Sequence, residues 1–167
     1  MSLGFEEIFI NLEFLTILVV YNRRRELIER VKILDEEVEE NTNNFFVKEI
    51  VIDVFYGRKE LDLKILNLSC LTEFQKKVLI KTKDIPRGKV STYKKLSEKV
   101  GVEGGARAVG NVMRFNPFPI LIPCHRVIKS NREIGEYGGG KTLKRKLLIF
   151  EGVGFENKWK VLNEYVV

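Results

Sequence analysis

The sequence is poor in the residues that form disulfides and metal sites. It has two cysteines, Cys70 and Cys124, and a single histidine among 167 residues. Without a secretory signal, two cysteines are expected to remain reduced thiols rather than form a disulfide. One histidine and two distant cysteines also provide no spaced set of zinc ligands. We therefore predict neither a disulfide nor a metal site.

Long apolar runs are also missing. The longest one, residues 14–20 (FLTILVV), follows an acidic residue and is far shorter than the ~20 residues that a membrane-spanning helix needs. No basic segment or small-residue cleavage site accompanies it, so it does not read as a signal peptide. We interpret it as a buried strand and expect a cytoplasmic protein with no membrane partner.

The charge is distributed unevenly along the chain. Residues 1–70 contain nine Lys and Arg against fourteen Asp and Glu, a net charge of −5, whereas residues 71–167 contain twenty against nine, a net charge of +11. Such a basic half favours a polyanionic partner, most commonly nucleic acid. The alternative is a solvated lysine-rich surface without a partner.

The N-terminal part predicts a small α/β domain over residues 1–70. Residues 14–22 and 26–34 are rich in β-branched residues and predict two strands of a hairpin. Residues 45–57 have apolar residues at helical spacing and end at a glycine, and residues 61–66 read as a third strand. This part carries no evident chemistry, so we expect it to support the rest of the chain.

The C-terminal part, residues 71–167, predicts a mainly helical domain. A helix follows Thr72 as N-cap and ends at Pro86, and a second begins at Ser91 or Thr92 and closes at Gly101. A third helix, within residues 104–116, ends before Pro117. Two helices joined by a short glycine-containing turn indicate a helix-turn-helix. The predicted fold class is thus mixed α/β (α+β), with a short N-terminal antiparallel sheet and a C-terminal domain of winged helix-turn-helix type.

Small residues surround Arg107 in the third helix. They are Gly104, Gly105, Ala106, Ala108 and Gly110. Glycine inside a helix costs up to ~1 kcal/mol relative to alanine, so this pattern indicates close approach of another group. Packing against a core helix is one alternative, but an arginine in the middle favours a DNA strand.

Three prolines in residues 117–123 predict a stiff, extended connector that delivers Cys124 to a defined place. A hairpin over residues 126–137, a glycine-rich turn at residues 138–140 and a last helix over residues 141–152 are expected to follow.

Cys124 beside His125 raises the question of a reactive thiol. A free thiol has a pKa near ~8.5, so attack at neutral pH needs a base, and His125 is adjacent. Neighbours on a strand point to opposite faces, so the pair requires a sharp turn or a water relay. Glu151, at the end of the last helix, is a candidate to orient the imidazole. The alternatives are a buried structural cysteine and a structural histidine. Cys70 has no such surroundings, and we interpret it as structural.

The sequence resembles a known family in this region. The segments NPFPILI and PCHRV, preceded by ARAVGNVMR and followed by YGGG, are similar to those of the methylated-DNA--protein-cysteine methyltransferases, or O6-alkylguanine-DNA alkyltransferases. The resemblance covers residues 74–152, nearly half of the chain.

The resemblance implies a role for each matching residue. Cys124 accepts the alkyl group, His125 acts as its base through a water, Glu151 orients the imidazole, Asn116 holds the turn, and Tyr93 donates toward the departing guanine. The implied DNA contacts include Arg107, which replaces the extruded nucleotide, together with Thr92, Ala106 and Gly110. The implied substrate pocket is formed by Met113, Val127, Ile134, Gly135, Tyr137, Gly138 and Gly139.

The family also implies a partner and a reaction. The partner is double-stranded DNA that contains O6-alkylguanine and is bound through its minor groove, by a protein that we expect to be a monomer. The nucleotide is flipped out, and the alkyl group moves irreversibly to Cys124 in one turnover without a cofactor.

This sequence departs from the family pattern in two places. The cysteine and histidine ligands of the N-terminal zinc site found in some relatives are missing, and Gly138 stands where some relatives have serine. The glycine lacks a hydroxyl contact to the substrate oxygen.

Two alternatives remain at this point. One is a winged helix-turn-helix module that binds alkylated DNA without chemistry. The other is a cysteine hydrolase that uses Cys124, His125 and Glu151 for acyl transfer, against which stand the missing oxyanion-hole motif and the basic C-terminal part.

Overall fold

The computed structural model describes residues 4–34, 36–41 and 44–167. These residues form two compact units: the first holds the described residues up to Cys70 together with Pro117–Leu121, and the second holds Leu71–Asn116 and Ile122–Val167. Pro117–Leu121 joins the first unit because the backbone N–H of Val31 donates to the Pro117 carbonyl at 2.8 Å. Residues 1–3, 35 and 42–43, which fall in the predicted N-terminal domain, lie outside the described residues.

The first unit is built on a three-stranded antiparallel sheet in the order β1-β2-β3. The strands are β1 (Phe5–Leu12), β2 (Leu15–Asn22) and β3 (Leu27–Leu34). Alternate side chains of the paired strands are fully buried, for example where Ile8 faces Val19 and Ile10 faces Ile17. The period of two in the sequence therefore becomes one buried face.

Strand β1 was not predicted from the sequence. Its segment FEEIFINL contains two adjacent glutamates, and only Glu13 and Phe14 separate it from β2. This connection lacks the Gly, Asn or Asp that marks a two-residue hairpin, so no local signal announced the pairing.

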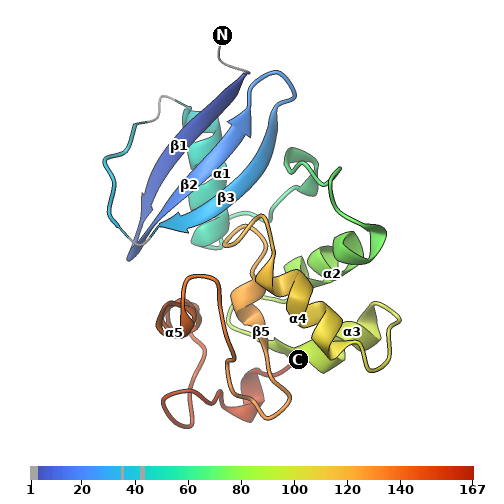
Figure 1. Cartoon of the computed structure of the whole chain (residues 1–167). Coiled ribbons are helices and arrows are strands. Elements are labelled where there is room, and N and C mark those ends of the chain that lie inside the picture. The colour runs from blue at the N-terminus through green and yellow to red at the C-terminus, as the bar shows by residue number, and fades with distance from the viewer. Residues whose placement is uncertain (1–3, 35, 42–43) are drawn as a thin grey trace. The chain divides into compact units, whose positions relative to one another are not determined.

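Helix α1 (Phe45–Phe55) packs on the sheet in the first unit (Figure 1). Val47, Val51 and Phe55 recur at four-residue spacing and are buried. The helix ends as predicted at Gly57, whose φ of +71° is the left-handed conformation of a C′ glycine.

The predicted third strand over residues 61–66 is wrong. Leu63–Ile65 form a short 3-10 helix, η1, with Asp62 as its N-cap, and only Leu66 bridges to β3, at Ile28. The Asp62 side chain accepts from the Lys64 N–H, and this local bond competes with extension of the strand.

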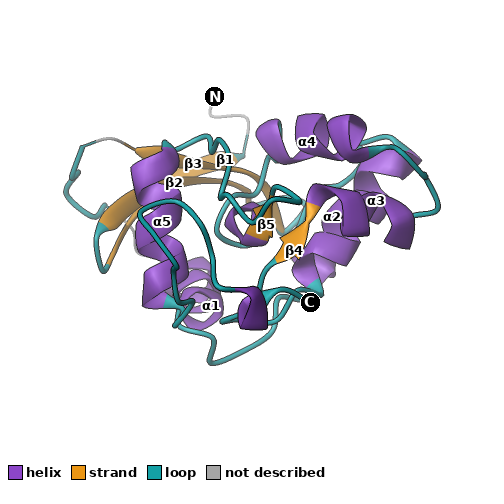
Figure 2. Ribbon diagram, turned by 90° about the horizontal axis from the view of Figure 1, so that it is seen from below, coloured by secondary structure: helices purple, strands orange, loops and turns teal. Residues whose placement is uncertain are grey.

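The second unit has a mainly helical periphery around a small parallel sheet. Its elements are α2 (Glu73–Lys83), β4 (Ser91–Thr92), α3 (Tyr93–Lys99), α4 (Ala106–Arg114), η2 (Cys124–Arg126), β5 (Val127–Ile128), α5 (Lys141–Phe150) and η3 (Asn163–Tyr165). Strands β4 and β5 run side by side (Figure 2). Together with Ile128 of β5, an apolar core is formed by Val90, Ile134, Leu148, Val153 and Val161.

The predicted helix starts of α2 and α3 are confirmed. Thr72 forms a capping box with Gln75, and the Thr92 hydroxyl accepts from the Lys95 N–H at 3.1 Å. Helices α3 and α4 pack together as the predicted helix-turn-helix, and the mixed fold class is confirmed.

The small residues near Arg107 have separate causes. Gly104 and Gly105 precede α4 rather than lie within it, and Gly104 has a φ of +70°. A Cβ on Gly105 would lie 2.6 Å from Val102 Cγ1, so there the close neighbour belongs to the same loop. At Gly110, inside the helix, an added Cβ would meet no atom within 4 Å apart from its chain neighbours and the nearby helix backbone.

Two predictions for the segment around Cys124 are wrong. The connector is a series of turns rather than an extended chain, and Ile120 has a φ of +74°. The expected hairpin over residues 126–137 is reduced to a tight turn in which the Lys129 N–H donates to the Glu133 carbonyl at 2.9 Å. Beyond this turn, β5 pairs in parallel with β4, and Glu133 and Ile134 pair with Lys160 and Trp159.

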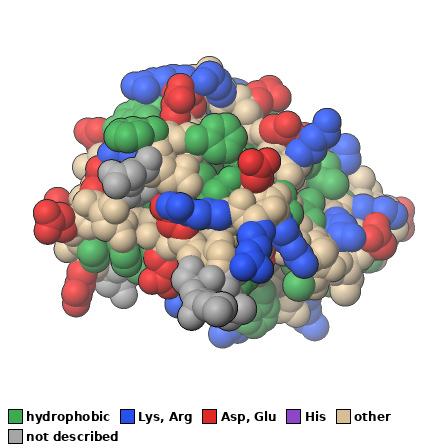
Figure 3. Space-filling view, turned by 90° about the horizontal axis from the view of Figure 1, so that it is seen from above, with side chains coloured by type: hydrophobic (Ala, Val, Ile, Leu, Met, Phe, Trp, Pro, Cys, Tyr) green, Lys and Arg blue, Asp and Glu red, His purple; other side chains and the backbone are tan. Residues whose placement is uncertain are grey.

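Charged and hydrophobic side chains are mixed on one face of the surface (Figure 3). Lys, Arg, Asp and Glu are interspersed with hydrophobic side chains on the face shown in Figure 3. Within the described residues, no helix combines the length and the apolar composition that crossing a bilayer requires.

Candidate active site

A tight turn presents the Cys124 thiol. Pro123, with φ −79° and ψ 64°, forms an inverse γ-turn in which the Cys124 N–H donates to the Ile122 carbonyl at 2.8 Å. The Asn116 side-chain amide donates to the same carbonyl at 3.0 Å. Two donors on one oxygen therefore fix the chain just before Cys124, which begins η2.

His125 is buried behind the thiol and paired with Glu151. Its Nε2 lies 2.9 Å from Glu151 Oε1, and 2 % of the residue is exposed. A carboxylate only accepts hydrogen bonds, so Nε2 carries the proton and Nδ1 is left as the acceptor. Nδ1 is buried and has no hydrogen-bond partner among the described residues. The ring therefore presents a free lone pair, as a general base requires.

Arg126 holds the carboxylate in place. Its Nε donates to Glu151 Oε2 at 2.9 Å and its Nη2 to Oε1 at 2.8 Å, while Nη1 donates to the Ile85 carbonyl at 2.7 Å. Such a two-point guanidinium–carboxylate pair fixes orientation as well as charge. Glu151, the C-cap of α5, is thus aimed at His125 from one side and clamped from the other.

The charges of this cluster follow from its burial. Burial alone would raise the pKa of Glu151, but the charges and hydrogen bonds of His125 and Arg126 outweigh it and hold the pKa far below its usual range. Burial lowers the pKa of His125 despite the opposing effect of Glu151. At neutral pH the site therefore contains a carboxylate and a neutral imidazole.

The thiol is protonated at rest. Burial raises the pKa of Cys124, and the Asn116 hydrogen bond and the Lys144 charge only partly oppose this. Attack at neutral pH would therefore need a base that removes the thiol proton, and the neutral His125 is the candidate for it.

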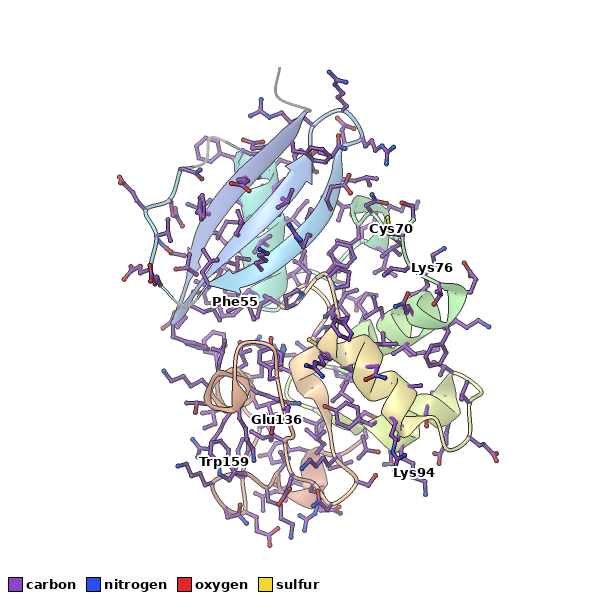
Figure 4. All side chains as sticks on the ribbon, in the orientation of Figure 1. Phe55, Cys70, Lys76, Lys94, Glu136 and Trp159 are labelled. Carbon is purple, nitrogen blue, oxygen red and sulfur yellow. The ribbon has the colours of Figure 1, made fainter. Side chains whose placement is uncertain are left out.

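Cys124 opens into a cavity of about 570 Å³ in the second unit. Its lining residues are Tyr93, Gly110, Met113, Arg114, Cys124, Lys129, Glu136, Tyr137 and Gly138. Glu136 lies on the loop between β5 and α5 (Figure 4). The thiol has 5 % of its residue surface exposed, so the cavity is its route to a substrate.

Two further groups act near the thiol: Tyr93 lines the same cavity, and Lys144, which is fully buried and is not a lining residue, contributes a charge. Burial raises the pKa of Tyr93 to about 12, so its phenol stays a hydrogen-bond donor. Burial lowers the pKa of Lys144 to about 7, and its Nζ donates to the Val127 carbonyl at 2.6 Å and lies 5.9 Å from the centre of the Tyr93 ring.

The structure brings together most of the predicted site residues. Cys124, His125, Glu151, Asn116 and Tyr93 form one cluster with the contacts given above. Of the predicted pocket wall, Met113, Tyr137 and Gly138 line the cavity. The remaining four, Val127, Ile134, Gly135 and Gly139, are not among its lining residues, and Val127 and Ile134 are fully buried.

Some of the predicted DNA-contacting residues are exposed or line the cavity, and one of them is buried. Arg107 is exposed on α4, Ala106 begins this helix, and Gly110 lines the cavity. Thr92 is 6 % exposed and its hydroxyl caps α3, so its structural role accounts for it. Cys70 is an exposed free thiol rather than a buried packing residue (Figure 4).

Sequence reasoning missed several residues of the site. Lys144 stands three and four residues before the buried Leu147 and Leu148 and seven before Glu151, so helical spacing puts all four on one face of α5. A lysine on the apolar face of a helix was the signal in the sequence that could have indicated a buried functional group. Arg126 follows His125 directly, but its bond to Glu151 had no counterpart in the sequence pattern.

Comparison with known proteins gives a consistent result. The family model described as "6-O-methylguanine DNA methyltransferase, DNA binding domain" matches residues 73–153. A methylated-DNA--protein-cysteine methyltransferase of Thermococcus barophilus is 36% identical over 135 residues, which cover 79% of this chain and 74% of the relative. One from Methanothermobacter thermautotrophicus is 41% identical over 99 residues, 59% of this chain and 55% of the relative.

Solved structures extend the likeness to the first unit. An O6-methylguanine methyltransferase of Mycobacterium tuberculosis, 27% identical, superimposes with a TM-score of 0.72 over 88% of this chain and 92% of that one. An O6-methylguanine DNA methyltransferase of Methanococcus jannaschii, 30% identical, gives a TM-score of 0.60 over 89% and 95%.

The chain belongs to the family of methylated-DNA--protein-cysteine methyltransferases, which confirms the resemblance drawn from its motifs. Several curated relatives are matched over only part of their length, for example 55% of the Methanothermobacter protein and 39% of the rat protein.

Proposed function

We propose that the chain repairs DNA by moving the alkyl group of O6-alkylguanine from duplex DNA to Cys124. Each molecule acts once, because the thioether product is stable and no described group is placed to remove it. The observation that carries the proposal is the Cys124 thiol on the wall of the cavity, followed directly in the chain by His125, which is paired with Glu151. We further propose that the protein acts as a monomer in the cytoplasm.

The bonding changes balance without a cofactor. The thiol proton passes through one bridging water to Nδ1 of His125, and the imidazolium that forms is stabilised by the Glu151 carboxylate at 2.9 Å. The sulfur then attacks the alkyl carbon in line, so that a C–S bond forms as the C–O6 bond breaks. The departing guanine takes up one proton and His125 returns one to solvent.

The leaving group needs stabilisation while it carries negative charge. The Tyr93 phenol lines the cavity and remains protonated, so it can donate a hydrogen bond to the purine. Lys144 Nζ lies 5.9 Å from the centre of the Tyr93 ring, and in its protonated form it adds positive potential that favours both the thiolate and the leaving anion.

Access to the alkyl carbon requires extrusion of the nucleotide, which costs a few kcal/mol. Arg107 is exposed on α4, the helix that also supplies Gly110 and Met113 to the cavity wall. We assign Arg107 to the space that the nucleotide vacates, with α4 in the minor groove. The net charge of +11 over residues 71–167 supports binding to phosphates.

Related structures support a DNA partner. A solved structure of the Mycobacterium tuberculosis protein in complex with DNA is 26% identical and superimposes with a TM-score of 0.69 over 86% of this chain.

The proposed function is tested by titrating O6-methylguanine duplex with the protein and measuring the guanine restored. We expect one equivalent per molecule and then no further product. Cys124→Ser should restore none while it still binds the duplex, and Cys70→Ser should match the wild type. Turnover beyond one equivalent, or activity in Cys124→Ser, would contradict the assignment.

Binding without chemistry is the competing function. A Schizosaccharomyces pombe protein solved with DNA that contains O6-carboxymethylguanine is 34% identical, with a TM-score of 0.52 over 57% of this chain. Here the thiol, its base and the carboxylate are all in place, which favours transfer. Duplex binding with no restored guanine would establish the binding function instead.

A further inference from the structure

Helix α4 has a continuous exposed stripe. Arg107, Ala108, Asn111, Arg114 and Phe115 are exposed, whereas Val109, Val112 and Met113 are buried. The exposed positions follow helical spacing, so they form one side of the helix and its C-cap. Neither guanidinium has an ion-pair partner within the described part of the chain. The stripe therefore has a cation near each end and small or polar residues between them.

Phe115 lies where this stripe meets the cavity. It is 70% exposed, and Arg114, which lines the cavity, has its Cζ 5.6 Å from the Phe115 ring centre. The next residue, Asn116, bonds the Ile122 carbonyl that fixes the thiol-bearing turn. The Arg114 guanidinium thus lies over one face of the ring, and most of the Phe115 surface remains exposed.

We propose that Phe115 stacks on the DNA base step beside the extruded nucleotide, as a second wedge alongside Arg107. This inference rests on the proposed function. Apolar side chains inserted between base steps are a recurrent way to hold a kinked, opened duplex, and base–aromatic stacking does not depend on sequence. Arg114, which is exposed beside the ring, provides a positive charge complementary to a phosphate of that step.

Exposure alone does not identify Phe115 as a DNA contact, because single exposed apolar residues are common. Phe46, on α1, is 59% exposed and does not line the cavity beside Cys124. Phe115 differs in sharing one stripe of α4 with two exposed arginines, of which Arg114 lines that cavity. Phe46 therefore serves as the matched control.

The first test compares Phe115→Ala with Phe46→Ala and Arg114→Ala. Affinity for an O6-methylguanine duplex is measured across a salt series, and alkylation of Cys124 is measured with free O6-benzylguanine. We expect Phe115→Ala to weaken duplex binding about five-fold to hundred-fold, which is the range for loss of one stacked base. Its salt dependence and its rate with the free base should stay those of the wild type, since the ring contacts neither phosphates nor the cavity interior.

The two control variants should behave differently. Arg114→Ala should reduce the slope of log affinity against log salt by about one, because one phosphate contact is lost. Phe46→Ala should leave every quantity unchanged.

The second test detects stacking directly. Phe115→Trp in a Trp159→Phe background places the only tryptophan at this position. We expect duplex addition to quench its fluorescence and the variant to bind as tightly as the wild type.

The outcomes separate the two proposals. If the wild type binds alkylated duplex and labels Cys124, but Phe115→Ala binds equally well or the tryptophan is not quenched, the stacking role is wrong and the proposed function stands. If the wild type itself neither binds the duplex nor becomes alkylated, the proposed function fails.

Discussion

At the scale of single residues, one buried carboxylate organises the site. Glu151 contacts His125 through Oε1 and Arg126 through both oxygens, and its side chain is 5 % exposed. Arg126 anchors the carboxylate, so that the imidazole is oriented by a group that cannot rotate away. These contacts keep Glu151 ionised, whereas burial keeps His125 neutral against the opposing effect of Glu151.

Glu151→Gln should impair both transfer and stability. Losing the group that orients and stabilises the imidazolium should slow single-turnover transfer by roughly ten-fold or more, a part of what a general base contributes. Arg126 would be left buried without its counter-charge, which costs about 3–5 kcal/mol in the free energy of unfolding. Single-turnover rates and urea unfolding measure the two effects.

The matched control is Glu73→Gln, because Glu73 pairs with Lys76 on an exposed surface. It should change neither quantity. A Glu151→Gln variant with wild-type rate and stability would show that the carboxylate has no role in the site.

The pH dependence of the wild-type transfer rate is a separate prediction. The rate should fall in acid only below the ordinary histidine pKa of about 6.5, since burial lowers the pKa of His125.

Lys144→Met should separate stability from activity. Lys144 is fully buried and its pKa is lowered to about 7, whereas an unfolded lysine has a pKa of about 10.4. Between these values the unfolded state binds more protons, so the wild-type free energy of unfolding should rise with pH from about 7 to about 10. Lys144→Met should be at least as stable at pH 7 and should lose this contribution to the rise.

The same variant should transfer the alkyl group more slowly, because the positive potential beside Cys124 and Tyr93 is removed. Urea unfolding at several pH values and single-turnover kinetics measure the two effects. A variant that is less stable at pH 7 and fully active would contradict this account of Lys144.

At the scale of elements, α4 supplies part of the cavity wall and the exposed stripe, and the glycine just before this helix differs in role from the glycine inside it. Gly105→Ala places a Cβ 2.6 Å from Val102 Cγ1 and 3.0 Å from the Val102 carbonyl, so it should destabilise the fold by about 1–3 kcal/mol. The Cβ of Gly110→Ala meets no atom within 4 Å apart from its chain neighbours and the nearby helix backbone, and the substitution should stabilise the helix by up to about 1 kcal/mol.

Of the two substitutions, only Gly110→Ala should slow alkyl transfer, because its added methyl group narrows the cavity that Gly110 lines. Urea unfolding and single-turnover kinetics on both variants test this division. Equal effects of the two substitutions on both quantities would contradict it.

The elements that could be predicted are those with local signals. Thr72, Thr92 and Gly57 mark the ends of α2, α3 and α1, because caps and C′ glycines act within one turn of the chain. Strand β1 and the parallel pairing of β4 with β5 depend on partners distant in sequence, so nothing local announced them. The same contrast between local signals and distant contacts holds for the site. Sequence motifs indicated Cys124, His125 and Glu151, whereas the places of Lys144 and Arg126 in the site became visible only in the folded structure.

At the scale of the whole molecule, the division of charge corresponds to the two units. The acidic part, residues 1–70, contributes the sheet and α1, and the basic part, residues 71–167, contains every residue of the proposed active site. The description of the N-terminal part as a support for the alkyltransferase part remains a prediction.

The two cysteines provide the most direct measurement of the central claim. Cys70 is exposed and Cys124 is buried, so general chemical reactivity would favour Cys70. After incubation with O6-methylguanine duplex, peptide mass spectrometry should find one added CH2 per molecule, on Cys124 and not on Cys70. A methyl group on Cys70, or on neither cysteine while the duplex is bound, would contradict the account.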